Sequence, residues 1–424
     1  MPSSQHRRRK SSTTNLGDLP SFLENSPFFI PFSNEESPAQ SVPKPTFSQL
    51  VRSKNAQALL AFLVGVFLFW YLMPRKGDIS YEALGRWGLL HGGGAQCLYD
   101  PKALVAVPNI TDLGTKEYEG LDWEKLAYVT YVTHKDVLCN SVMLFESLDR
   151  LGSRAKRVML IPDTEEFRTE DYSSRSAQED ATVKRLLKLA ESKYGVKLVR
   201  MRIIRKQLGF QMWAASYSKL HTFSMAEYTR IIILDSDATL LAPLDELFLL
   251  PPSTATMPRA YWLDKPTLAS HIMVITPSAA EFARVQKEID KAGLGVYDME
   301  IVNALYGATC NVLPHKPYAL LTGEFRRAKD KHTAYLSPGE VWDANQVKKE
   351  ARLVHFSDYP MPKPWEGISQ NDVKASRPAC VKTEGGEDCS DRDVWRGFYR
   401  EFRERRMEVC GLESMAWWGS NPNY

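Results

Sequence analysis

The chain has 424 residues, of which 44% are hydrophobic, and its 54 Lys and Arg nearly balance its 51 Asp and Glu. This length and apolar content allow one large α/β domain with added segments. The net charge of only +3 excludes a surface built to bind a large polyanion such as a nucleic acid.

The N-terminal part predicts a membrane anchor. Residues 1–55 are polar and show no apolar period, so we expect a disordered cytosolic tail. Residues 56–73 are apolar and uncharged, at the lower length limit of a spanning helix, with Trp70 and Tyr71 near one end. They start too far from Met1 for a cleaved signal peptide. A signal anchor with a lumenal catalytic side is therefore predicted, in a thin membrane of the early secretory pathway.

Residues 74–121 predict a stem or irregular lead-in, with a glycosylation sequon at Asn109. Strands and helices then alternate, with strands expected at 127–132, 157–162, 196–199, 231–234 and 270–275 and helices at 137–151, 179–192 and 216–228. This order predicts an α/β fold with a mostly parallel sheet flanked by helices. The first strand lacks a following Gly-x-Gly-x-x-Gly and the chain lacks a Gly-Lys-Ser/Thr loop, which argues against a dinucleotide dehydrogenase or a P-loop enzyme.

Two carboxylates end the most apolar of these strands. Residues 231–234 predict a strand buried on both faces, and Asp235 and Asp237 follow it at once. Unpaired buried carboxylates are costly, so they should meet a cation or open into a cleft. Oxygen ligands at a strand end suit Mg²⁺ or Mn²⁺, often with a phosphate. The alternative is a surface turn with two solvated aspartates.

Three more polar residues stand at the ends of predicted elements. His355 follows an apolar strand and can add a nitrogen ligand to Mn²⁺. Lys363 lies between prolines and can offer a point charge to a phosphate. Taken singly, His355 is more often a satisfied core histidine, Lys363 a solvated lysine, and Asp298 a helix cap.

Together these pieces resemble glycosyltransferase family 8, the glycogenin-like group. The resemblance runs from about residue 127 to 365 and rests on six pieces in the family's order: Val-Thr-x-x-Asp-Val-x-Cys from Val132, Ser-Lys-Leu at 218–220, Leu-Asp-Ser-Asp at 234–237, Leu-Asp-Glu-Leu-Phe at 244–248, residues 298–303, and His-Phe at 355–356 with Lys-Pro-Trp at 363–365. The long form of the last piece, the anchor and the Cys-rich tail look closest to the fungal Golgi N-acetylglucosaminyltransferases, the glucose N-acetyltransferase branch.

That resemblance implies a GT-A fold over residues 122–365 and a retaining transfer from a UDP-sugar to a mannan-type glycan acceptor. It also implies a single-pass type II protein of the Golgi membrane. Mn²⁺ would be held by Asp235, Asp237 and His355, and Asp298 would be the catalytic residue near the acceptor. The donor would be bound by Thr133, Lys219, Ser270 and Lys363. No protein nucleophile is evident, which favours front-face attack by the acceptor hydroxyl.

Three departures from the family pattern bear on the donor. Ala269-Ser270-His271 replaces Asn-Ser-Gly, Met299 replaces Gln after Asp298, and the His355–Lys363 spacing is two residues longer without its Gly. The first two fall where donor and acceptor meet, so N-acetylglucosamine is the predicted sugar. The alternatives are a glucosyl- or galactosyltransferase of the same family, an inactive sugar-binding member, and a glycoside hydrolase with paired carboxylates.

Residues 366–424 form a predicted C-terminal extension. Trp395, Phe398, Tyr399 and Phe402 fall at helical spacing and predict an amphipathic helix packed on the catalytic domain. Cys380 and Cys389 flank a polar loop and can bridge in an oxidising compartment, whereas Cys139 and Cys310 are expected to be lone buried thiols.

Overall fold

The structure is a computed structural model that describes residues 104–108, 116–167, 177–206, 213–309, 311–359 and 361–412. The chain divides into two units, Met1–Gly92 and Gly93–Tyr424, and all described residues belong to the second. The predicted tail, the predicted anchor and the sequon at Asn109 lie outside the described residues. Among the helices that are described, none is long and apolar enough to cross a membrane. The predicted domain boundaries stay predictions.

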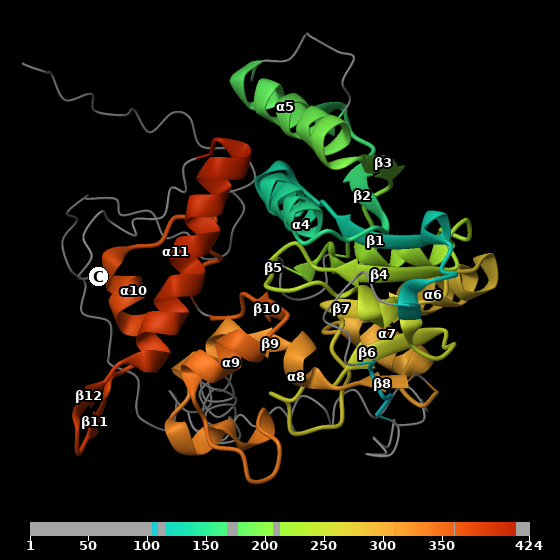
Figure 1. Ribbon diagram of the computed structural model, residues 1–424. Helices are drawn as coiled ribbons and strands as arrows, with labels where there is room; N and C mark the ends of the chain where they lie inside the picture. The colour runs from blue at the N-terminus through green and yellow to red at the C-terminus, as the bar shows by residue number, and fades with distance from the viewer. Residues whose placement is uncertain are drawn as a thin grey trace, which may run out of the picture. The chain divides into compact units, whose positions relative to one another are not determined.

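A mixed sheet of seven strands lies at the centre of this unit, in the order β3-β2-β1-β4-β7-β6-β8 (Figure 1). The first four strands in that order are mutually parallel, β7 runs antiparallel to both of its neighbours, and β6 and β8 are parallel. The predicted α/β class with a mostly parallel sheet is therefore confirmed. The strands are β1 (Leu126–Tyr131), β2 (Lys156–Pro162), β3 (Val196–Met201), β4 (Arg230–Leu234), β6 (Ala255–Pro258), β7 (Ile272–Ile275) and β8 (Asn311–Leu313).

Helices cover both faces of this sheet. Side chains alternate along a strand, so Ile232 and Leu234 of β4 enter one hydrophobic cluster while Ile231 and Ile233 enter the other. The first cluster includes residues of α4 (Leu138–Arg150), α5 (Ala177–Tyr194), α9 (Ala344–Glu350) and α11 (Ser390–Cys410). The second includes residues of α6 (Ala279–Lys291) and α7 (Asp298–Tyr306). Both faces of β4 are therefore buried, and this explains why its sequence is continuously apolar.

A small second sheet brings a distant segment to the end of β4. Its order is β5-β10-β9, with β5 (Ala238–Leu240), β10 (Leu353–His355) and β9 (Leu320–Leu321). The antiparallel register sets His355 opposite Ala238, and the backbone N–H of Phe356 donates to the carbonyl of Asp237 at 2.9 Å. Sheet pairing therefore places the imidazole beside the carboxylates.

Two local predictions are corrected. The predicted helix at 216–228 is a shorter 3₁₀ helix, η7 (Ser216–Ser224). The hydroxyls of Thr222 and Ser224 donate to carbonyls three residues earlier, at 2.7 Å each, and such bonds compete with an α-helical ladder. Cys139 is not a lone thiol, because it forms a disulfide with Cys410.

The C-terminal extension packs as predicted. Residues Trp395, Phe398, Tyr399 and Phe402 of α11 are all buried in the first cluster, and α11 lies beside α4 (Figure 1). Before it come α10 (Gln370–Ser376) and a hairpin of β11 (Val381–Thr383) and β12 (Gly386–Asp388). The predicted disulfide between Cys380 and Cys389 closes this hairpin.

Candidate active site

Asp235, Asp237 and His355 form one cluster at the end of β4. One ligand atom from each lies within 4.8 Å of the others, and Nε2 of His355 is 3.0 Å from Oδ1 of Asp237. Two carboxylates and one imidazole are a donor set that suits Mn²⁺ and related divalent ions. The three predicted ligands therefore come together and fit the predicted ion.

Lys363 reaches the same cluster from beyond β10. Its Nζ donates to Oδ2 of Asp237 at 2.7 Å and to the carbonyl of Phe356 at 2.5 Å. Burial raises the pKa of Asp237, but His355 and Lys363 outweigh it and hold that pKa well below its usual range. The Lys363 side chain keeps 26% of its surface exposed, so it is less buried than Lys219, whose side chain is 2% exposed.

Lys219 of η7 lies between two carboxylates of the candidate site, Asp235 and Asp298. Its side chain is 2% exposed, and Nζ lies 2.7 Å from Oδ1 of Asp235 and 2.8 Å from Oδ2 of Asp298. Burial lowers the pKa of Lys219, but the two carboxylates outweigh it and raise that pKa well above the usual value. In the structure Lys219 is a buried counter-ion, and contact with the donor stays a prediction.

Asp298 is the first residue of α7 and not its cap. The N-cap is Tyr297, whose backbone N–H donates to Oε2 of Glu300 at 2.9 Å. The carboxylate of Asp298 accepts a hydrogen bond from the Ser270 hydroxyl at 2.7 Å. Burial raises the pKa of Asp298, but Lys219 and hydrogen bonds outweigh it, so the pKa is lowered and the group stays ionised. Ser270 and Asp298 thus join the metal-ligand cluster through Lys219.

Thr133 stands apart from these contacts. It follows β1, the parallel neighbour of β4, so it lies at the same edge of the sheet as Asp235. Its hydroxyl is 2.9 Å from Nδ1 of His134. The predicted role of Thr133 at the uracil side stays a prediction.

His271 was seen in the sequence only as a departure from the family pattern. It is 5% exposed, and its ring centroid lies 5.0 Å from that of His355 and 5.9 Å from that of Trp262. Among the described residues its Nε2 atom has no hydrogen-bond partner although it is buried. A buried, unpaired ring nitrogen beside the metal ligands is suited to meet a bound ligand. A histidine directly before a strand gives no such signal in the sequence.

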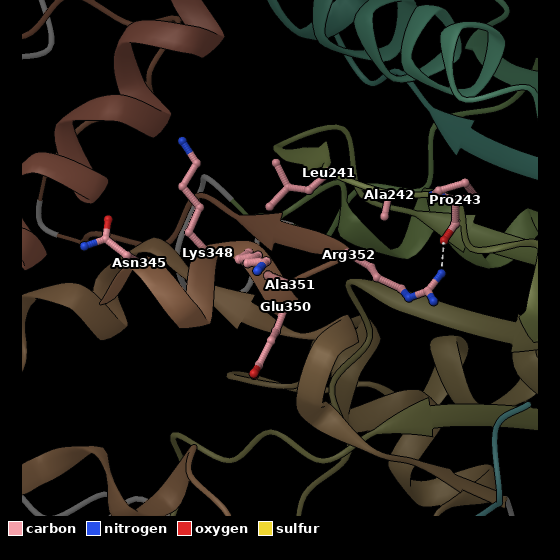
Figure 2. Close-up of a pocket in the computed structure, with 9 residues that line it drawn as sticks. Leu241, Ala242, Pro243, Asn345, Lys348, Glu350, Ala351 and Arg352 are labelled. Carbon is pink, nitrogen blue, oxygen red and sulfur yellow. Dashed lines mark hydrogen bonds between the residues drawn. The ribbon is translucent and has the colours of Figure 1, made fainter. Parts of the chain in front are cut away.

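A separate surface pocket of about 630 Å³ shares no residue with this cluster (Figure 2). Its walls are the segment Leu241, Ala242 and Pro243 and the end of α9 with the residues that follow it. Its main charged groups are already paired. Arg352 lies 3.2 Å from Glu246 and donates to the carbonyl of Pro243 at 2.8 Å, and Lys348 lies 2.7 Å from Glu401. Since Arg352 precedes β10, this pocket lies at the opposite end of that strand from His355.

Comparison with known proteins identifies relatives. No protein-family model matches the chain. The chain is 44% identical over 299 residues to Glucose N-acetyltransferase 1 of Gibberella zeae, which covers 68% of this chain and 63% of that protein. It is 41% identical over 312 residues to Glucose N-acetyltransferase 1 of Aspergillus fumigatus, which covers 69% of this chain and 79% of that protein. Among solved structures, the apo form of the WbbM bifunctional glycosyltransferase shows a distant likeness, with a TM-score of 0.43 and 12% identity over 69% of this chain and 52% of that one.

The chain spans less than two thirds of the Gibberella protein but most of the Aspergillus protein. At this identity the chain belongs to the glucose N-acetyltransferase 1 family of transferases, as its resemblance predicted.

Proposed function

We propose that the chain is a retaining glycosyltransferase with a GT-A fold that moves N-acetylglucosamine from a UDP-sugar to a mannan-type glycan acceptor. The observation that carries this proposal is the cluster of Asp235, Asp237 and His355, with Lys363 bonded to the carboxylate of Asp237. An inactive sugar-binding member has no need to keep three metal ligands together. A glycoside hydrolase needs two carboxylates on either side of a sugar ring, whereas Asp235 and Asp237 share one metal-ligand cluster.

The chemistry required is stabilisation of the leaving group. Asp235, Asp237 and His355 would hold Mn²⁺, which when bound would supply positive charge close to the donor diphosphate. Lys363 would add a second charge, because its partly exposed side chain can turn its ammonium from Asp237 to a phosphate oxygen. Charges fixed in place before the reaction need no reorganisation as negative charge develops on the departing UDP.

Asp298 serves the acceptor side. Lys219 and Ser270 hold its carboxylate ionised, so it can accept a hydrogen bond from the acceptor hydroxyl and orient it. The hydroxyl oxygen forms the new bond to the sugar's anomeric carbon on the face from which the UDP oxygen departs, and its proton passes to that oxygen.

The proposal includes the Golgi membrane, with a type II anchor and a lumenal catalytic domain. The two disulfides, Cys139–Cys410 and Cys380–Cys389, support a lumenal location because such bonds persist in oxidising compartments. The glucosyl- or galactosyltransferase alternative differs only in the donor and is separated by donor competition.

The test is UDP release from a panel of UDP-sugars with Mn²⁺, for the wild type, Asp235→Asn and Asp237→Asn. Each variant removes an ion ligand without changing volume, so the rate should fall by about 10²-fold or more, the scale expected when one fixed charge-stabilising group is lost. Asp163→Asn is the control for the chemical change itself, since Asp163 is an exposed aspartate directly after β2, another strand of the same parallel set. If both variants release UDP at a rate near that of the wild type, even when EDTA is present, the metal-dependent mechanism is refuted.

A further inference from the structure

Asp358 is a buried carboxylate between two residues of the proposed site, His355 and Lys363. It is 4% exposed, yet it is not one of the metal-ligand residues. Its Oδ1 accepts a hydrogen bond from Nε1 of Trp395 at 3.1 Å, and its Oδ2 accepts one from the Tyr399 hydroxyl at 2.6 Å. Both donors come from α11, so the C-terminal helix holds the loop that carries Lys363.

A second element holds the same loop from another side. The hydroxyl of Thr322, in the 3₁₀ helix η9 (Thr322–Arg326), donates to Asp358 and accepts from the backbone N–H of Ser357 at 3.0 Å. Nη1 of Arg326 donates to the Asp358 carbonyl at 2.8 Å and lies 3.5 Å from its Oδ1. A buried carboxylate with this many donors is costly to displace, because each donor would be left unpaired.

Helix α11 is itself fixed against the first half of the domain. Its last residue, Cys410, is bonded to Cys139 of α4. Nη1 of Arg406 donates to Oδ1 of Asn140 at 3.1 Å, in a buried contact. The Tyr399 ring also packs edge-on against Phe356, with centroids 5.2 Å apart. The helix therefore gives the loop a rigid support.

The two ends of the loop are not held equally. His355 belongs to β10 and is paired with both β5 and β9, so its position is set by the sheet. Lys363 lies beyond the strand, where Asp358 is the buried anchor that precedes it. Loss of that anchor should displace Lys363 far more than His355.

We infer that Asp358 is a positioning residue, whose hydrogen bonds to Trp395 and Tyr399 of α11 hold Lys363 where it meets the donor diphosphate. This rests on the proposed function, since it assigns Lys363 to a nucleoside diphosphate. The carboxylate acts through the loop and touches neither donor nor metal. Helix α11, outside the stretch that resembles the wider family, thus sets donor affinity.

The test compares Tyr399→Phe with Tyr128→Phe in the full chain. Tyr128 is a matched control, because its buried hydroxyl also donates to a buried carboxylate, Asp245, at 2.6 Å. UDP binding with Mn²⁺ is measured by calorimetry, and Mn²⁺ binding alone by electron paramagnetic resonance. Tyr399→Phe should weaken UDP binding by about tenfold, the lower end of the loss seen when a residue that orients a binding group is changed. It should change Mn²⁺ affinity less than twofold, because His355 is held by the sheet. Tyr128→Phe should leave both within about twofold while losing similar stability.

A double-mutant cycle separates positioning from general destabilisation. In a Lys363→Met background, Tyr399→Phe should have no further effect on UDP binding, because the residue it positions is gone. Two outcomes would overturn the inference: full additivity of the two changes, or a Tyr399→Phe effect on UDP binding no larger than that of Tyr128→Phe. The proposed function would survive either outcome as long as the wild type binds UDP. A wild type that binds no UDP in the presence of Mn²⁺ would overturn both.

A second pair covers the case in which Tyr399→Phe does not fold. Trp395→Phe removes the other α11 donor to Asp358. Its control is Trp342→Phe, which removes a buried indole hydrogen bond of 2.6 Å to Asp391. The same tenfold difference in UDP affinity between variant and control is expected, and equal affinities would contradict the inference.

Discussion

Replacing Lys219 by Met tests the buried charge arrangement directly. Met keeps most of the side-chain volume but removes the ammonium that lies 2.7 Å from Asp235 and 2.8 Å from Asp298. The side chains of these carboxylates are 15% and 9% exposed, so water replaces little of the lost interaction. Removing one partner of a buried ion pair costs about 3–5 kcal/mol, because the other charge stays buried. The Ser270 hydroxyl still donates to Asp298, which favours the lower end, about 3 kcal/mol.

The matched control is Lys197→Met. Nζ of Lys197 lies 3.3 Å from Glu227, but the two side chains are 56% and 48% exposed. An exposed pair of this kind contributes about 1 kcal/mol or less, since solvent and salt screen it. The same lysine-to-methionine change is thus made in a buried and in an exposed ion pair of one chain.

The measurement is urea unfolding followed by tryptophan fluorescence under non-reducing conditions, which keep both disulfides closed. Urea is chosen because it is uncharged and does not screen ion pairs. Equal m-values for the variants and the wild type would show that the unfolded states expose similar surface. A free energy of unfolding for Lys219→Met within about 1 kcal/mol of that for Lys197→Met would refute the role of Lys219 as a buried counter-ion.

Two further predictions concern topology and the donor. Protease added to sealed microsomes should remove residues 1–50 and spare the rest, because the span at 56–73 is followed by the long catalytic part; digestion of that part would show that it faces the cytosol. UDP-N-acetylglucosamine should outcompete UDP-glucose, and Ala269→Asn should shift the ratio of kcat/KM toward glucose by restoring a hydrogen bond to a sugar hydroxyl. Preference of the wild type for UDP-glucose, or an unchanged ratio in the variant, would contradict this donor assignment.

The two aspartates of the candidate metal site were predictable because their signal is local. Three consecutive isoleucines and a leucine require a strand buried on both faces, and carboxylates directly after such a strand need a partner. The structure confirms the burial of β4 and brings Asp235 and Asp237 together with His355. His355 was found through the order of motifs along the chain, which the local pattern alone does not provide.

The remaining contacts depend on tertiary packing that no local pattern encodes. Lys363 meets Asp237 across 126 residues, Tyr399 meets Asp358 across 41, and Cys139 meets Cys410 across 271. Asp298 is an example in which the more common role is wrong. An Asp at the start of a helix is usually its N-cap, but here the N-cap is Tyr297. The position of Lys219 as a counter-ion likewise follows from the burial of η7 against the sheet and not from its own sequence.

Lys219 and Lys363 together neutralise the three carboxylates of the candidate site, Asp235, Asp237 and Asp298. Lys219, 2% exposed, pairs with Asp235 and Asp298. Without it, two carboxylates would stay buried with no positive partner, which is costly. Lys363, 26% exposed, pairs with Asp237 and would exchange that contact for a donor phosphate in the proposed reaction. A site with two equally buried lysines would resist a divalent ion, and one with two exposed lysines would leave Asp235 and Asp298 repelling each other. The difference in burial between Lys219 and Lys363 therefore suits Lys219 to a structural role and Lys363 to the phosphate contact of the proposed reaction.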